Sequence, residues 1–402
     1  MKKKILWSML HAVMLVVVTY FLWNIPSDWT DSQRWLQRIS LARTIVAEQD
    51  TLPDDLILVN TCYDHVMVTA YDELGMECGQ IDITDRTKLL RLFQHLAAAN
   101  DYRYIVCDID FNSELQSPED RRLFSIVGKM PRCVVPRHTE GASTPAILYN
   151  KTAVSEYSTN IQNNNFLKYQ YLTASGESMA LRMAREIDNV EIDKCGPFYF
   201  VNGKVCVNAH ILNIETNVRN EYQQNEESSE LANKNILQLG TDVLPMLDSD
   251  ITGLFSNKIV MVGDCFRDDI HTTVAGSTSG LMIIYNAYHA LIDKLNVPPS
   301  WVWIALLMVY FLLTFFVLSR ISPKDILPQS WVDKHPILCK MAEWVGFQIL
   351  FTIIGLLSFF CAKTYIDAWL FATYFTLLES VFTFIAKIDS KLIKRFICIF
   401  SK

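Results

Sequence analysis

Long uncharged apolar runs are the feature that most restricts what this chain can fold into. Residues 5–23 and 301–319 each hold 19 residues without a charge, which is enough for a helix to cross the ~30 Å hydrocarbon core of a bilayer. Two further apolar runs follow at residues 344–362 and 369–386. The sequence therefore predicts four transmembrane α-helices and one large domain at residues 24–300.

The first run could instead be a cleaved signal peptide, because three lysines precede it. Its apolar core is longer than a signal peptide usually has. The chain then continues Asn-Ile-Pro-Ser-Asp at residues 24–28, which offers no small-residue cleavage site. We therefore predict an uncleaved N-terminal anchor.

Lysine and arginine residues near the ends of the runs predict the orientation, since they favour the cytoplasmic side. They gather at residues 1–4, at the linker 320–343 and in the basic tail 387–402. These three segments are predicted to be cytoplasmic, and the domain at 24–300 to be extracytoplasmic. The chain is thus expected to be a multi-pass protein of a bacterial-type inner membrane, with a periplasmic domain and cytoplasmic termini.

Charge excludes some partners of the outer domain. The whole chain has a formal charge of −7, and the residues outside 24–300 hold 13 basic and 6 acidic side chains, so the domain is near −14. A domain this acidic is a poor match for nucleic acid or anionic lipid. Its seven cysteines are odd in number and form no C-x-x-C pair. We predict no disulfide, no metal site and no cofactor.

The order of apolar segments predicts an α/β domain with a mostly parallel sheet flanked by helices. Continuous apolar runs of strand length occur at residues 55–60, 104–111 and 133–136, with helix-like segments at 88–99 and 118–129 between them. Strands that alternate with helices favour parallel pairing, and buried parallel strands are apolar throughout. Further along, Asn-Gly at 202–203 predicts a hairpin over 198–207.

The stretch KIVMVGDCFRDDIHTT, residues 258–273, is the most enzyme-like part of the chain. Asp264, Asp268, Asp269 and His271 follow a predicted strand, where α/β sheets place their ligand sites. These side chains could form a metal or acid–base group. They could equally end the strand and hydrogen-bond its turn, with Asp264 and Asp269 lining a ligand pocket.

Other candidate sites carry weaker signals. Asp108 and Asp110 form a D-x-D on what is predicted to be one strand, a short pattern that some nucleotide-sugar transferases use to hold a metal. GSTSG at 276–280 opens a helix and could hold an anion through backbone N–H groups, although a flexible loop is expected there. Glu379 interrupts the fourth run, where a carboxyl group usually faces protein, and His11 in the first run is a candidate partner for it.

The residues around 259–287 resemble a sensory family, the CHASE domains of the second type (CHASE2). The resemblance rests on Ile259, Val260, Val262 and Gly263 at a strand end, Asp269 in the turn, Gly280 at the helix start and Asn286–Ala287 within the helix. Residues 54–60 and 105–110 are similar to two earlier strands of the family, with Asp108 at its usual aspartate. Gln80–Ile83 and Thr278–Ser279 depart from the family pattern, the first where a Trp-Pro pair is expected.

The resemblance implies a sensor, and the residues leave two alternatives open. A sensor of this kind would bind an unknown small ligand or a periplasmic protein and would have no enzymatic activity of its own. A homodimer is compatible with the layout. Only residues 387–402 follow the last run, so a separate cytoplasmic or membrane partner is expected to receive the signal. The alternatives are an envelope scaffold and a membrane-anchored metal-dependent hydrolase or transferase.

Overall fold

The computed structural model describes most of the chain. The described residues are 2–26, 52–71, 76–112, 116–138, 144–156, 166–218, 235–249, 253–273, 276–319, 335–362 and 370–381. Two compact units emerge, one formed by residues 26–296 and the other by residues 1–25 together with 297–402.

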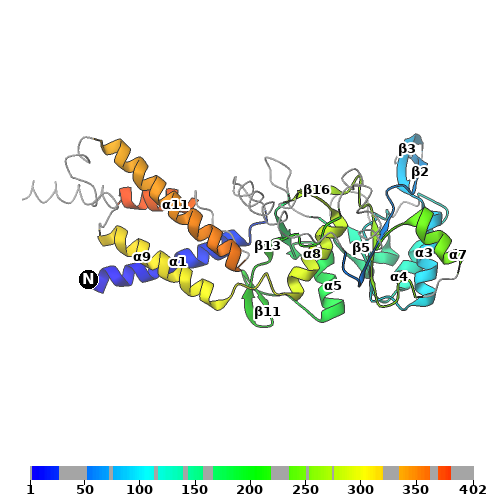
Figure 1. The fold of residues 1–402 in the computed structure, drawn as a ribbon, viewed down its shortest axis with the longest axis horizontal. Coiled ribbons are helices and arrows are strands. Elements are labelled where there is room, and N and C mark those ends of the chain that lie inside the picture. Colours follow the sequence, from blue (N-terminus) through cyan, green and yellow to red (C-terminus); the bar gives the residue numbers. More distant parts are fainter. Residues whose placement is uncertain are drawn as a thin grey trace, which may run out of the picture. The chain divides into compact units, whose positions relative to one another are not determined.

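A six-stranded sheet lies at the centre of the 26–296 unit (Figure 1). Every neighbouring pair in it is parallel, as the apolar runs predict. The spatial order is β14 (Ile236–Gln238), β1 (Leu56–Asn60), β15 (Ile259–Gly263), β4 (Tyr104–Cys107), β5 (Cys133–Arg137) and β6 (Thr152–Val154). The strand that comes last in the chain, β15, therefore separates the two that come first.

Helices cover both faces of this sheet (Figure 1). The first face carries α3 (Arg86–Ala99), α4 (Asp120–Lys129) and the short α7 (Leu244–Asp248), whose apolar side chains share one core with Val59, Cys107 and Val262 of the sheet. The opposite face carries α5 (Met179–Asp188) and α8 (Gly280–Ile292), which pack against each other. Because successive strand residues point to opposite faces, the continuous apolar runs serve both cores.

Smaller elements surround this layered core. A hairpin of β2 (His65–Tyr71) and β3 (Glu77–Thr84) lies between β1 and α3 in the chain. The remaining short elements are η1 (Ala146–Lys151), β7 (Lys168–Gln170), β8 (Leu172–Thr173), β9 (Gly176–Glu177), β10 (Asp193–Cys195), β11 (Phe198–Val201), β12 (Lys204–Cys206), β13 (Ala209–Ile211), η3 (Leu239–Val243), β16 (Ile270–Thr273) and β17 (Gly276–Ser279).

Local sequence explains several boundaries. Asp85 caps α3, since its carboxylate accepts a hydrogen bond from the Thr87 N–H at 2.9 Å, and Asn100 ends the helix in the left-handed conformation. Asn202 and Gly203 both have positive φ, at 49° and 74°. Such a pair makes the tight turn that joins two antiparallel strands, and it confirms the predicted hairpin.

Two expectations about local structure are wrong. The predicted strand at 104–111 ends at Cys107, so Asp108 and Asp110 lie in the loop after β4 rather than on one face of a strand. GSTSG is not a flexible loop, because Gly276–Ser279 forms β17 and pairs antiparallel with β16. The backbone groups of Gly276–Ser279 form the hydrogen bonds of this two-stranded sheet. A short polar segment such as this one gives little sign of a strand in the sequence.

The seven cysteines of the domain are free thiols.

The second unit contains the apolar helices. Among the described residues, two helices are long and apolar enough to cross a membrane, α1 (Lys2–Trp23) and α9 (Ser300–Ser319). That is two rather than the four predicted. Apolar helical segments at Trp344–Ser358, within α11 (Pro336–Ala362), and at Leu370–Val381 are shorter. Because α11 begins at Pro336, the end of the predicted linker 320–343 is helical, while 320–334 and the tail lie outside the described residues.

Helices α1 and α9 pack antiparallel within this unit. Trp23, near the end of α1, lies 5.2 Å from Trp303 at the start of α9, measured between ring centroids. At the other end, His11 Nδ1 is 2.8 Å from Thr314 Oγ1. Both ends of the intervening 26–296 segment therefore leave the helix pair on the same side.

A buried ion pair lies beneath the loop that follows β4. Arg86 and Asp120 are 3% and 1% exposed, and Arg86 Nε is 3.4 Å from Asp120 Oδ1. Arg86 also donates to the Asp110 carbonyl oxygen at 3.2 Å and stacks over the Phe111 ring. The guanidinium group thus ties α3, α4 and the Asp108–Asp110 loop together.

We expect Asp120→Ala to destabilise the domain by about 3–5 kcal/mol, since it leaves a buried guanidinium without its counter-charge. The matched control is Asp248→Ala, which removes the exposed partner of Arg91 and should cost about 0–1 kcal/mol. Urea unfolding of the full-length protein followed by tryptophan fluorescence measures both. Equal losses in the two variants would contradict a structural role for the buried pair.

Candidate functional site

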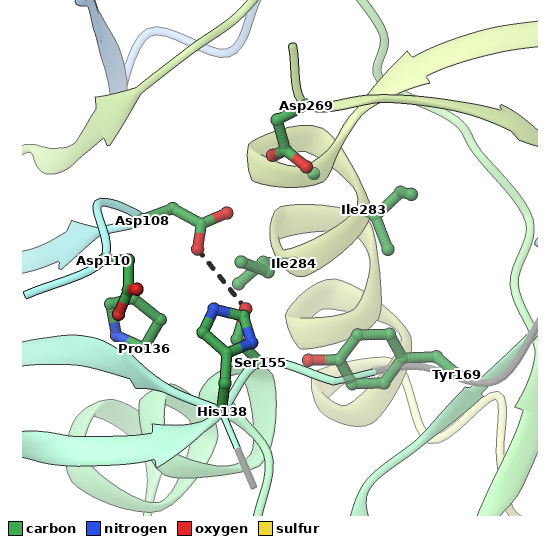
Figure 2. A pocket seen from close by; sticks show the side chains of 10 residues that line it. Asp108, Asp110, Pro136, His138, Ser155, Tyr169, Asp269, Ile283 and Ile284 are labelled. Atoms are coloured by element: carbon green, nitrogen blue, oxygen red, sulfur yellow. Dashed lines mark hydrogen bonds between the residues drawn. The ribbon is translucent and has the colours of Figure 1, made fainter. Parts of the chain in front are cut away.

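A cavity of about 200 Å³ opens at the carboxyl end of the sheet. Its walls come from the loops after β4, β5 and β6 and from the start of α8 (Figure 2). Neighbouring parallel strands end at the same edge, so the residues that follow them gather there. The lining residues are Asp108, Asp110, Pro136, His138, Ser155, Tyr169, Asp269, Gly280, Ile283 and Ile284.

Two of the predicted site residues, Asp108 and Asp269, come together in this cavity. Asp108 follows β4 directly, and Asp269 precedes β16 in the loop that follows β15. Since β15 and β4 are adjacent in the sheet, carboxyl groups separated by 161 positions in the chain become neighbours. Burial raises the pKa of Asp108, and the His138 charge and a Ser155 hydrogen bond oppose that rise.

The pKa of the Asp269 carboxyl group is raised as well. Burial and the neighbouring charges of Asp108 and Asp264 raise its pKa to about 8. A hydrogen bond with Asp108 acts in the same direction, and a bond from the Gly280 backbone opposes it. Two carboxyl groups this close cannot both ionise cheaply, so the pair holds one proton near neutral pH and titrates as a unit.

Gly280 is required beside this pair. A Cβ atom at position 280 would overlap the carboxyl group of Asp269, and the Gly280 N–H donates to the Asp269 carbonyl oxygen at 2.9 Å. Close approach of a side chain to a helix start is a role that glycine fills because it has no Cβ. The residue therefore fixes the distance between the acid pair and the first turn of α8.

His271 supports Asp269 from outside the lining. Its Nε2 atom is 2.7 Å from Asp269 Oδ1. Burial lowers the pKa of His271, so the imidazole is neutral at physiological pH and can donate its one N–H to the carboxyl oxygen. The histidine orients the acid rather than facing the cavity itself.

Asp264 has the structural role that sequence reasoning left open. Its Oδ1 atom accepts from the backbone N–H groups of Phe266 and Arg267, at 2.8 and 2.9 Å, and Oδ2 accepts from Asp268 at 2.7 Å. A carboxylate that satisfies three donors of its own turn builds that turn. Asp264 is absent from the cavity wall, and Asp268 is exposed.

Three polar lining residues, His138, Ser155 and Tyr169, were not singled out in the sequence. His138 and Ser155 follow β5 and β6 in the same way that Asp108 follows β4, so the rule that strand ends converge could have found them. Ser155 Oγ donates to Asp108 Oδ1 at 3.4 Å. Tyr169 lies on β7, outside the six-stranded sheet, and nothing in its sequence context indicates the cavity.

Within the described part of the chain, no group of three or more His, Cys, Asp or Glu side chains is arranged to hold a metal ion. A family model for the CHASE2 domain matches residues 15–319, most of the chain. The chain belongs to the CHASE2 domain family. Neither the curated proteins nor the solved structures contain a match to it.

Membership of the CHASE2 family makes this an extracytoplasmic sensory domain, and apolar helices flank it on both sides. The family match begins within α1 and ends with α9, so it covers the second part of α1, the whole 26–296 segment and all of α9.

The two polar candidates in the apolar runs of this CHASE2 protein also have defined positions. His11 contacts Thr314 through Nδ1 and the Tyr374 hydroxyl through Nε2, so one imidazole joins α1, α9 and the segment 370–381. Glu379 is buried in the same unit. The predicted partnership of His11 with Glu379 stays a prediction.

We expect the acid pair to make the stability of this CHASE2 domain depend on pH. Because the folded pKa of Asp269 lies above the unfolded value of 3.8, the folded state binds the extra proton and loses stability as pH rises from about 4 to 8. Asp269→Asn should flatten that fall, and Asp268→Asn, at an exposed position, should leave it unchanged. Thermal unfolding midpoints at pH 5 and pH 8 test this, and equal pH slopes for all three proteins would contradict it.

We expect His11→Ala to lower the stability of the helix bundle by about 1–2 kcal/mol, the scale of interhelical hydrogen bonds in membranes. Leu10→Ala is the matched control, because Leu10 is 54% exposed on the same helix and makes no comparable bond in the described residues. SDS titration of the protein in mixed micelles measures both. A smaller loss for His11→Ala than for the control would contradict the bridge.

Proposed function

We propose that this protein binds a small polar ligand in the cavity at the carboxyl end of its sheet and passes the binding signal into its membrane helices. The observation that carries the proposal is that the cavity wall and the chain leading to the membrane share one helix. Gly280, Ile283 and Ile284 line the cavity from the first turns of α8. A ligand that favours one position of α8 would shift the population of that position.

The route from α8 to the second apolar helix is short. Asn296 is buried, and its carbonyl oxygen accepts from the Val207 N–H at 2.8 Å. Residues 297–299, Val-Pro-Pro, are all that separates this anchored position from the start of α9 at Ser300. Proline fixes φ, so the connection has few free torsions to absorb a displacement.

The proposed topology places this sensor in the inner membrane with residues 24–300 in the periplasm. The positive charges near the helix ends support that orientation. The antiparallel packing of α1 and α9 supports it as well, since it brings both ends of the domain to one side. The four predicted spans, cytoplasmic termini and a separate cytoplasmic or membrane protein that receives the signal belong to this proposal.

A binding function fits the acids better than a hydrolytic one. In the enzymatic alternative, Asp264 to His271 would act as one catalytic group. The carboxylate of Asp264 instead accepts hydrogen bonds from the backbone of its own turn. Of the residues in that group, only Asp269 lines the cavity. The scaffold alternative needs no cavity at all, so ligand binding separates it from the sensor.

We expect a thermal-shift screen of small metabolites on the full-length protein in nanodiscs to yield compounds that raise the unfolding midpoint. The same compounds should fail to stabilise Ile284→Trp, which fills the cavity, and Asp108→Asn, which keeps its shape. Ile147→Trp is the matched control, because Ile147 is exposed and outside the lining, and it should respond like the wild type.

Stabilisation that persists in both cavity variants would place the ligand elsewhere. A screen in which no compound stabilises the wild type, while the protein copurifies with an envelope protein, would favour the scaffold instead.

A further inference from the structure

The lining of the cavity has a marked charge imbalance. Among the described residues that line it, three carboxyl groups, those of Asp108, Asp110 and Asp269, face it with one imidazole, His138, and without any lysine or arginine (Figure 2). Arg137, next to His138 in the chain, donates to the Ser175 carbonyl oxygen instead. Arg86 is compensated by Asp120. An anionic ligand would therefore meet like charge, and a cation would meet opposite charge.

Part of the cavity wall is apolar. Ile283 and Ile284 project from α8, and Pro136 lies at the end of β5 on the side of Asp110 (Figure 2). At about 200 Å³ the cavity is smaller than the roughly 300–1,000 Å³ typical of drug-sized ligands. A hydrated metal ion makes no use of such a wall, whereas a short alkyl chain does.

The polar groups around the acid pair are mostly acceptors. Carboxylates only accept, and the Ser155 and Tyr169 hydroxyl oxygens can each accept as well. The Tyr169 ring is buried, and its hydroxyl points into the cavity (Figure 2). A primary ammonium group offers three donors from one atom, which matches several acceptors that converge from β4, β6 and β7.

We propose that the cavity binds a small primary amine in its protonated form, with the ammonium group taking the place of the proton between Asp108 and Asp269 and the alkyl part lying against Ile283 and Ile284. This inference rests on the proposed function, because it assumes that the cavity is a ligand site. It names the chemical class of the ligand and a condition that controls its binding.

Proton displacement follows from the groups that surround the pair. Asp269 faces Asp108, which follows β4, and Asp264, which lies in the loop after β15. It also faces the neutral His271 on β16. Asp108 in turn faces His138, which follows β5. In the empty site the proton offsets repulsion between the acids. An ammonium group supplies that positive charge itself, so its binding releases the proton, and lower pH should oppose it.

The test uses the full-length protein in nanodiscs and n-butylamine as the probe. An alkylamine, like the lysine side chain with its pKa of about 10.4, stays protonated across the range tested. n-Butanol is the neutral control, n-butyrate the anionic control and Mg²⁺ the metal control. Isothermal titration calorimetry in two buffers of different ionisation enthalpy gives the affinity and the number of protons released.

We expect n-butylamine to bind with a dissociation constant on the order of millimolar, as a five-atom ligand can, and the three controls not to bind. Below the Asp269 pKa of about 8, affinity should fall about tenfold per pH unit with about one proton released. Asp108→Asn and Asp269→Asn should each weaken binding at least about tenfold, and Asp268→Asn should leave it unchanged.

The inference is overturned if n-butylamine fails to bind, if butanol, butyrate or Mg²⁺ binds as well, or if affinity rises as pH falls. The metabolite screen separates this failure from failure of the proposed function. If neutral or anionic compounds stabilise the wild type but not Ile284→Trp, the cavity is a ligand site and the amine proposal is wrong. If no compound of any class stabilises the wild type, both the ligand site and the amine proposal are wrong.

Discussion

The parallel pairing of β15 with β4 is the constraint on which the rest of the site depends. It brings the loop after residue 263 beside the loop after residue 107, and so sets Asp269 against Asp108. Other residues around the cavity contact one or other of these two carboxyl groups. Gly280 makes room for the Asp269 carboxyl group, His271 orients it, and Ser155 supports Asp108.

Hydrogen bonds and aromatic contacts join the helices of the second unit. Thr19 is bonded to Tyr310 and His11 to Thr314, and the rings of Trp23 and Trp303 lie 5.2 Å apart. Where such helices lie in lipid, hydrogen bonds and close packing associate them, because lipid gives no hydrophobic force between helices.

Much of the fold could be predicted from the sequence, and the reasons are physical. The apolar runs at 55–60, 104–111, 133–136 and 258–263 are long enough and uniform enough to predict buried parallel strands, although the second strand ends at Cys107. Asp85 and the Asn202–Gly203 pair carry local signals that are satisfied within a few residues. Such features can be predicted because the interactions that produce them are between residues close together in the chain.

The site was only half predictable, because its geometry depends on strand order. Asp108, Asp269 and His271 could be nominated as polar residues at strand ends, but the sequence does not state that β15 lies between β1 and β4. Without that order, Asp264 and Asp269 look equivalent, although one builds a turn and the other faces a cavity. Tyr169 reaches the site from β7, which pairs with β13 about 40 positions later in the chain. No local sequence pattern predicts that pairing.

The late position of β15 in the chain also governs how this protein can be made. Its central strand is synthesised after β1, β4, β5 and β6, so the sheet has an unfilled slot until residue 263 is available. Closing that slot pairs β15 with β1, about 200 residues earlier, and with β4, about 155 residues earlier, and such long-range pairing is slow. Translation reaches α9 only some 40 residues later. The strand that completes the sheet and the helix α9 are therefore synthesised close together in time.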